Sequence, residues 1–355
     1  MIHLLLLACR PPGPVVVSAA EQGLVEARPA VQGRDGGTSA LAWGRSIWTY
    51  GDTVLNVPDV DGTNWHHNSY AITDDLDASD GIGGFTEPLD AAGAPDYLIP
   101  PTEAEHTFNM AHLGEDCAEA PCGARWAVWP GEPVWDEARQ RALVFYGLIY
   151  AEPGAFNFEG RGSSVAIWTD PEGRPQRPLI DAGAEHPDIL WGEEDPGWGL
   201  GSFIEGDTLY SFSCSSGTWG VPCILGCVDL DHVLELEHWR YRSGQDWTTD
   251  RKKATMVVEA APIFSLSYAS ALEAFLMIYS PSFDDAIVAR TAPELWGPWS
   301  EETVLFVAKD QDPYDAVAHA ELAEEEGRVQ YITWSRSSGE GWFGTEFPVL
   351  RVELE

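Results

Sequence analysis

The sequence predicts an all-β fold, and two observations favour a β-propeller. Past residue 30 the chain reads as short runs of β-branched and aromatic residues between Gly, Pro, Asp and Asn, with almost no sustained helical periodicity. An aromatic-rich run also recurs after a Gly-Asp or Gly-Arg turn, as in 206–212 and 327–334. Many short strands at close spacing are typical of sandwiches, barrels and propellers and argue against βαβ units. At about 40 to 65 residues a blade, roughly 320 residues give five to eight blades.

The strands are expected wherever such a run is bounded by turn residues. One segment, 316–326, is rich in Ala and Glu and looks helical, but it equally suits a strand followed by an acidic turn. Segments 74–84 and 91–105 are expected to be long surface loops. The expected strands are 39–43, 46–50, 68–73, 125–129, 142–150, 163–169, 201–204, 208–213, 224–230, 236–242, 255–258, 262–266, 274–279, 286–291, 303–307, 328–335 and 347–354.

Acidic residues dominate the charge. The chain has 57 Asp and Glu against 20 Lys and Arg, a net charge of −37. Such a chain repels phosphate backbones and anionic lipid, so nucleic-acid binding is excluded. With 44% hydrophobic residues and 16 Trp, it has ample material for a large core. We expect one domain over residues 31–355, and a monomer.

The N-terminus has the features of an export signal. Residues 1–9 are apolar, too short to span a bilayer, and end in Leu-Leu-Ala-Cys9, which resembles a lipoprotein lipidation box. Cys9 would then carry the lipid, and the Pro- and Ala-rich residues 10–30 would be a linker. The alternative is a chance apolar N-terminus. The prediction is an exported protein, lipid-anchored to the bacterial membrane or cell surface.

The other cysteines fit an oxidising compartment. Cys117 and Cys122 are close enough to close a small disulfide loop, and two of Cys214, Cys223 and Cys227 can pair. A zinc site made of these last three would need a fourth ligand and lacks paired Cys-x-x-Cys spacing. We therefore predict the disulfide Cys117–Cys122 and no metal site.

The most informative stretch runs from Arg34 to Thr53. Its Arg34-Asp-Gly-Gly element and its aromatic strand ending in Gly51-Asp-Thr53 resemble the opening motif of the bacterial family named domain of unknown function 4185. Weaker matches follow in order at 67–71, 129–134, 197–201, 264–268, 295–299 and 314–322. The resemblance implies a five-bladed propeller and a glycoside hydrolase grouped with the endo-D-arabinanases, acting on a furanose-containing polysaccharide.

Glycoside hydrolysis generally needs two carboxyl groups across the scissile bond. Asp35 and Asp52 lie on either side of one expected strand, next to glycines that permit tight turns and close approach of a ligand. They are the candidate catalytic pair. The alternative is that both belong to ordinary turns, as Asp207 does in Gly206-Asp-Thr208. Glu321 is a candidate third acid, although a solvated surface position is the simpler interpretation.

Sugar binding needs flat apolar platforms with polar rims. Trp198, between two glycines, is the candidate platform, with Asn68, Ser69 and His319 as candidate sugar-binding residues. No cofactor is expected. A structural Ca²⁺ remains an alternative for the carboxylate-rich loops 59–64 and 75–81, although neither matches the twelve-residue helix-flanked loop. The rival function is a propeller that binds a glycan or a protein without catalysis.

Overall fold

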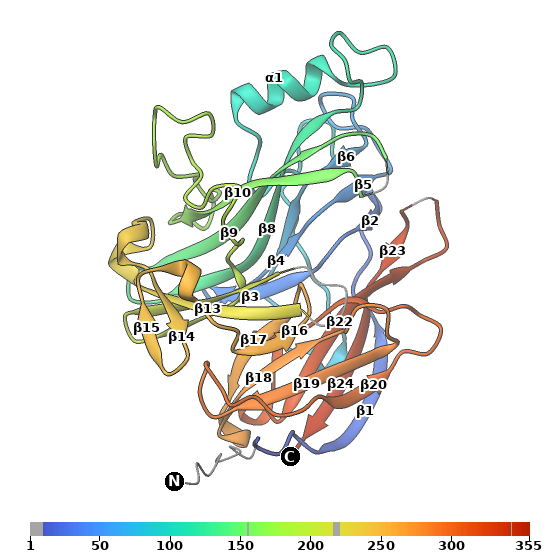
Figure 1. Ribbon diagram of the computed structural model, residues 1–355. Helices are drawn as coiled ribbons and strands as arrows, with labels where there is room; N and C mark the ends of the chain where they lie inside the picture. Colours follow the sequence, from blue (N-terminus) through green and yellow to red (C-terminus); the bar gives the residue numbers. More distant parts are fainter. Residues whose placement is uncertain (1–9, 155, 216–220, 342) are drawn as a thin grey trace.

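The computed structural model describes residues 10–154, 156–215, 221–341 and 343–355, and the predicted all-β class is confirmed. Most strands lie in five antiparallel sheets, each formed largely by a continuous part of the chain (Figure 1). The first contains β3 (Thr38–Ala42), β4 (Arg45–Tyr50) and β7 (Ser69–Thr73). The second contains β8 (Arg125–Asp136), β9 (Arg141–Ala151) and β10 (Phe158–Trp168).

The remaining sheets follow along the chain. The third contains β11 (Leu200–Glu205), β12 (Thr208–Cys214), β13 (Val221–Asp229), β14 (Arg240–Ser243), β15 (Asp246–Thr248) and β16 (Val258–Ala260). The fourth contains β17 (Ser265–Ala269), β18 (Ala274–Tyr279), β19 (Ala286–Ala292) and β20 (Thr303–Val307). The fifth contains β21 (Tyr314–Ala318), β22 (Val329–Ser337), β23 (Thr345–Glu346), β24 (Pro348–Leu354) and β1 (Val16–Leu24). A small extra sheet joins β2 (Val31–Arg34), β5 (Thr53–Leu55) and β6 (Trp65–His66).

The fifth sheet joins the two ends of the described chain. β24 lies between β22 and β1, with Ala20 opposite Arg351. The expected linker over residues 10–30 is therefore wrong for 16–24, which form a strand. Backbone pairing with β24, rather than burial of apolar side chains, holds this mostly exposed edge strand, so its composition gave little sign of it.

Two other expectations change. The expected loop 91–105 ends inside helix α1 (Glu103–Ala111), whose start is fixed by a capping box. Thr102 accepts a hydrogen bond from the Glu105 backbone, and the Glu105 carboxylate accepts one from the Thr102 backbone. Segment 316–326 follows the strand-and-turn alternative: it holds the end of β21 and two 3₁₀ turns, Ala320–Leu322 and Glu325–Gly327.

Apolar side chains pack between neighbouring sheets. The cluster around Phe212, Met277 and Trp299, for example, joins the third sheet to the fourth. Strands in the middle of each sheet are buried on both faces; Trp48, Tyr279 and other large aromatics are fully buried. No helix among the described residues is long and apolar enough to cross a membrane.

Two disulfides are present. Cys117 bonds to Cys122, and Cys214 on β12 bonds to Cys223, its partner in register on β13. Cys227 is free and half-buried. We expect a digest without reduction to release the 117–122 and 214–223 pairs as linked peptides, with only Cys227 alkylated, among these five cysteines. Mass spectrometry tests this directly, and alkylation of Cys117 or Cys122 in protein from an oxidising compartment would contradict it.

Candidate active site

A large open cavity of about 1030 Å³ is lined by residues from four of the five main sheets and from the segment directly before β17 of the fourth. We call it the aspartate cavity, because Asp35, Asp52 and Asp315 line it. Its walls are contributed by segments far apart in sequence. Examples from the five sheets or the turns leading into them are Thr38, Gly131, Leu200, Phe264 and Tyr314.

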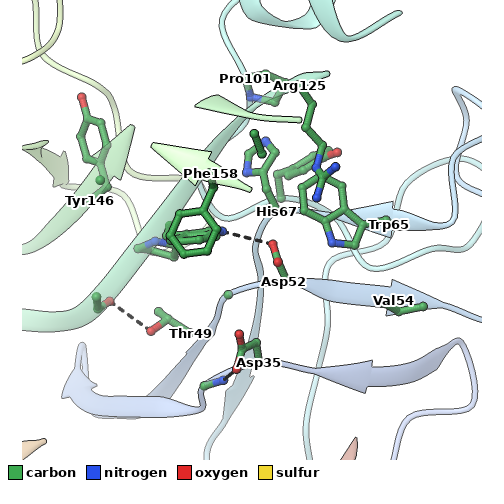
Figure 2. Close-up of a pocket in the computed structure, with 18 of the residues that line it drawn as sticks. Asp35, Thr49, Asp52, Val54, Trp65, His67, Pro101, Arg125, Tyr146 and Phe158 are labelled. Atoms are coloured by element: carbon green, nitrogen blue, oxygen red, sulfur yellow. Dashed lines mark hydrogen bonds between the residues drawn. The ribbon is translucent and has the colours of Figure 1, made fainter. Parts of the chain in front are cut away.

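Asp35 and Asp52 are brought together by backbone pairing. Asp35 directly follows β2 and Asp52 directly precedes β5, and these strands are antiparallel, with Arg34 opposite Thr53. The Asp35 N–H donates to the Asp52 carbonyl at 2.8 Å, and the Gly51 N–H donates to the Asp35 carbonyl at 2.8 Å. Figure 2 shows the two carboxyl groups on neighbouring backbone segments of the same cavity. The tripeptide Gly51-Asp52-Thr53 is thus more than a surface turn.

The cavity makes both carboxyls reluctant to ionise. Burial raises the pKa of Asp35, although its carboxylate accepts a hydrogen bond from the Gly36 N–H. Burial raises the pKa of Asp52 to about 7; a hydrogen bond from the Trp129 indole at 3.1 Å opposes the shift, and the charge of Asp35 adds to it. Asp52 therefore titrates near neutral pH.

Two of the other carboxyls that line the cavity, Asp315 and Glu132, have strongly raised pKa values and were not predicted from the sequence. Burial and then the charge of Asp35 raise the pKa of Asp315 well above its usual value. Burial and then the charge of Glu321 do the same for Glu132. Both residues fall within stretches that carry the family resemblance, 129–134 and 314–322, which was the available signal.

Glu321 and His319 lie outside the cavity lining. Glu321 is half-buried, with its carboxylate turned inward: one carboxylate oxygen accepts hydrogen bonds from Ser39 and Ser46, both at 2.5 Å. His319 is fully buried, bonds to Ser39 and stacks on Trp48. These residues form a polar network between the first and fifth sheets, so the solvated-surface interpretation of Glu321 is also wrong.

Asn68 and Ser69 are likewise fully buried and outside the cavity lining. The Asn68 side-chain oxygen accepts from the Leu98 and Ile99 N–H groups, and its amide nitrogen donates to the Ile99 and Val128 carbonyls at 3.0 and 2.8 Å. Ser69 bonds to Thr53 at 2.7 Å. His67, their neighbour, is the member of this motif that lines the cavity.

Trp198 borders the cavity but is only 4% exposed. Its ring packs against Trp239 and Tyr241 and close to Gly226, so it has no open face for a sugar. Trp129 and Phe158 are better placed. Both line the cavity, with ring centroids 5.0 Å apart and edge to face, and Phe158 is 45% exposed (Figure 2).

The two acidic loops considered for Ca²⁺ are organised by their own hydrogen bonds. In loop 59–64 the Asp59 carboxylate accepts from the Thr63 N–H and hydroxyl and bonds to His66. In loop 75–81 the Asp77 carboxylate accepts from the Ser79 N–H and hydroxyl. These bonds account for both loop conformations.

Asp207 provides the contrast with Asp52. Glu205 pairs with Thr208, so Gly206 and Asp207 form the two-residue turn of the β11–β12 hairpin. The Asp207 side chain is exposed and lies 3.4 Å from Arg139. The same tripeptide sequence thus lies at a surface turn here, whereas at 51–53 its Gly and Asp line the cavity.

Part of the chain matches a known protein family. Residues 167–338 match a family model described as domain of unknown function (DUF4185). The predicted family resemblance is confirmed. The DUF4185 match includes Asp315, whereas Asp35 and Asp52 precede it in the chain. No curated protein matches the chain.

Solved structures extend the likeness to nearly the whole chain. A putative hydrolase from Bacteroides ovatus is 13% identical, with a TM-score of 0.59, over 93% of this chain and 87% of that one. A family 117 glycoside hydrolase from the marine bacterium Zobellia galactanivorans is 11% identical, with a TM-score of 0.56, over 95% and 90%. An N-acetylgalactosamine deacetylase from F. plautii, bound to blood group B trisaccharide, is 10% identical, with a TM-score of 0.50, over 97% and 95%. At identities this low the likeness shows the fold alone, and that fold is glycoside hydrolase-like.

Proposed function

We propose that the protein hydrolyses glycosidic bonds in a furanose-containing polysaccharide, in the manner of an endo-D-arabinanase. The observation that carries the proposal is the convergence of Asp35, Asp52 and Asp315 on one open cavity, where burial raises the pKa of each. Carboxyl groups with raised pKa values in a cavity are the usual equipment for general acid and base catalysis of glycoside cleavage. The furanose specificity comes from the family resemblance.

We also propose that the fold is a five-bladed propeller with the aspartate cavity on its axis. Five main sheets follow one another along the chain, and β3, β8, β11, β17 and β21 each contact the next. β3 also contacts the 3₁₀ turn at Ala320–Leu322, which follows β21, so the series returns to its start. A cavity lined by four of these sheets and by the segment that leads into the other one supports this proposal.

The surroundings of the carboxyl groups suggest which of them is the general acid and which is the general base. Burial raises the pKa of Asp35 as well, but the charge of Asp35 adds to the upward shifts of Asp52 and Asp315, which favours Asp35 as the ionised partner. We assign Asp35 as the general base that activates water and Asp52, with a pKa of about 7, as the acid that protonates the leaving oxygen. The raised pKa of Asp315 favours its protonated form, which would lower the negative charge beside Asp35.

This assignment predicts the pH dependence. Turnover should fall as pH rises through about 7, because Asp52 then loses the proton that the leaving group needs. The measurement is kcat against pH from 4 to 9 on a polysaccharide substrate. A rate that instead climbs through pH 7 would exchange the roles of Asp35 and Asp52.

The direct test is a screen of the purified protein against arabinan and arabinogalactan, with product sizes analysed. Release of oligosaccharides by the protein and not by its Asp35→Asn variant supports hydrolysis. Binding of a polysaccharide without any release would favour the rival function, a glycan-binding propeller.

Export and lipid anchoring belong to the proposal. Disulfides at 117–122 and 214–223 suit an oxidising compartment, which supports export. Cys9, the expected lipidation site, lies outside the described residues. Lipid attachment is tested by labelling cells with a palmitate analogue, with a Cys9→Ala variant as control; equal labelling of both proteins would reject Cys9 as the site.

A further inference from the structure

Arg125 is the only lysine or arginine among the described residues that line the aspartate cavity. Seven carboxyl side chains line the same cavity: Asp35, Asp52, Asp59, Asp61, Glu132, Glu152 and Asp315. Burial favours the protonated form of several of them, but the other carboxylates still outnumber the single Arg125 guanidinium, so the cavity disfavours anionic ligands. A sugar that enters must therefore be held by neutral hydroxyl groups.

Arg125 is held by stacking rather than by an ion pair. Its guanidinium carbon lies 4.2 Å from the centre of the Trp65 ring. Its hydrogen bond among the described residues goes to the Gly123 carbonyl at 3.5 Å, and its buried Nε has no partner there. Several N–H groups of the planar Arg125 guanidinium can thus donate to a ligand.

His67 adds a second unpaired donor beside Arg125. The two hydrogens of the Asn68 amide are donated to the Ile99 and Val128 carbonyls, and the Val128 N–H donates to His67 Nδ1 at 3.1 Å, so Nδ1 is an acceptor. The hydrogen of His67 is therefore on Nε2. Burial lowers the pKa of His67 to about 3, so the ring is neutral. His67 is 1% exposed and Nε2 has no partner among the described residues, so its acceptor must come from a ligand or from water.

We propose that Arg125, stacked on Trp65 and backed by His67, forms a donor subsite that binds hydroxyl oxygens of a neutral sugar beside Asp52. Figure 2 shows Arg125, Trp65, His67 and Asp52 on one wall of the cavity. Donors on this wall and carboxyls at Asp35 and Asp315 complement a polyol, whose hydroxyls both accept and donate. That the ligand is a sugar rests on the proposed function. The subsite adds that this sugar is an uncharged glycan.

The test is a binding panel measured by calorimetry. Neutral probes are oligosaccharides of arabinan, arabinogalactan, xylan and galactan; acidic probes are oligogalacturonate and heparin oligosaccharides. The protein should bind a neutral probe most tightly, and Arg125→Met should raise the Kd of that probe about 10- to 100-fold, because a charged donor to its hydroxyls is lost. Arg125→Lys should recover only part of the affinity, because it cannot form a planar fork.

Arg161→Met is the matched control. Arg161 also lies over an aromatic ring, that of Tyr150, but it pairs with Glu159 and Glu193 and does not line the cavity. Its substitution should leave the Kd unchanged. An acidic probe as the tightest ligand, no binding of any probe at millimolar concentration, or unchanged affinity in Arg125→Met would each overturn the subsite.

Binding and turnover separate this inference from the proposed function. If the tightest probe is bound in an Arg125-dependent way but is not cleaved, the subsite stands and hydrolysis fails. If a polysaccharide is cleaved and Arg125→Met changes neither Kd nor KM, hydrolysis stands and the subsite fails. The unfolding temperature of Arg125→Met identifies any variant that simply does not fold.

Discussion

Asp35→Asn and Asp52→Asn should each lower turnover by about 10² to 10⁴-fold, the usual contribution of a positioned proton transfer. Both carboxyls line one cavity, and backbone hydrogen bonds hold the two residues side by side. Each substitution therefore removes a group that can transfer a proton and keeps the shape of the wall. Asp207→Asn is the control, because that residue is an exposed turn residue with the same neighbours in sequence. Its activity should be nearly intact.

The two variants should differ in how they respond to the leaving group. With an aryl glycoside that has an acidic phenol as leaving group, Asp52→Asn should recover much of its rate, because that phenolate needs no proton. Asp35→Asn should stay slow, because water still lacks its base. Full activity of either variant on the polysaccharide would remove that residue from the mechanism, and full activity of both would favour the binding propeller.

Asp52→Asn should lower activity but raise the stability of the fold above neutral pH. Its folded pKa of about 7 lies above the 3.8 of an unperturbed Asp, so the folded state holds its proton more tightly than the unfolded state. The native form therefore loses stability as pH rises from about 4 to about 7. Asp52→Asn should raise the melting temperature at pH 8 and leave it nearly unchanged at pH 4, which thermal scans at both values check.

The sequence could place Asp35 and Asp52 because their arrangement is local. They lie 17 positions apart, on segments that pair directly, and the glycines around them are visible in the sequence. Asp315 is different, because about 260 residues separate it from Asp52. It reaches the same cavity only because of the order in which the sheets pack. A pattern of short strands predicts neither that order nor that a sheet begins at Tyr314.

None of Trp198, Asn68 and His319 belongs to a strand, so strand alternation does not predict which side each one faces. Within 67–71 the sequence pointed to Asn68 and Ser69, whereas His67 is the residue that lines the cavity. Trp198 was chosen for its flanking glycines, but one of them, Gly199, lies close to Phe145, and the Trp198 ring packs against Trp239 and Tyr241.

Arg177→Met should destabilise the fold by about 3 to 5 kcal/mol, the usual effect of leaving buried charges without their partner. Its guanidinium is nearly buried, bonds to both oxygens of Glu105 at 2.6 and 2.7 Å, and donates to Asp188 at 2.7 Å. Glu105 belongs to α1 and Asp188 bonds to Tyr146 of β9. One arginine thus connects the helix, the 174–190 segment and a strand of the cavity wall.

The measurement is the free energy of unfolding from urea titrations of the two proteins at equal pH. Arg161→Met again serves as control, because its carboxylate partners Glu159 and Glu193 are exposed, and loss of such a surface pair should cost at most about 1 kcal/mol. If the two variants lose equal stability, the buried network does not hold α1 to the body. A loss confined to Arg177→Met, together with weaker ligand binding, would show that α1, which carries His106 and Met110 at the cavity, depends on this contact for its position.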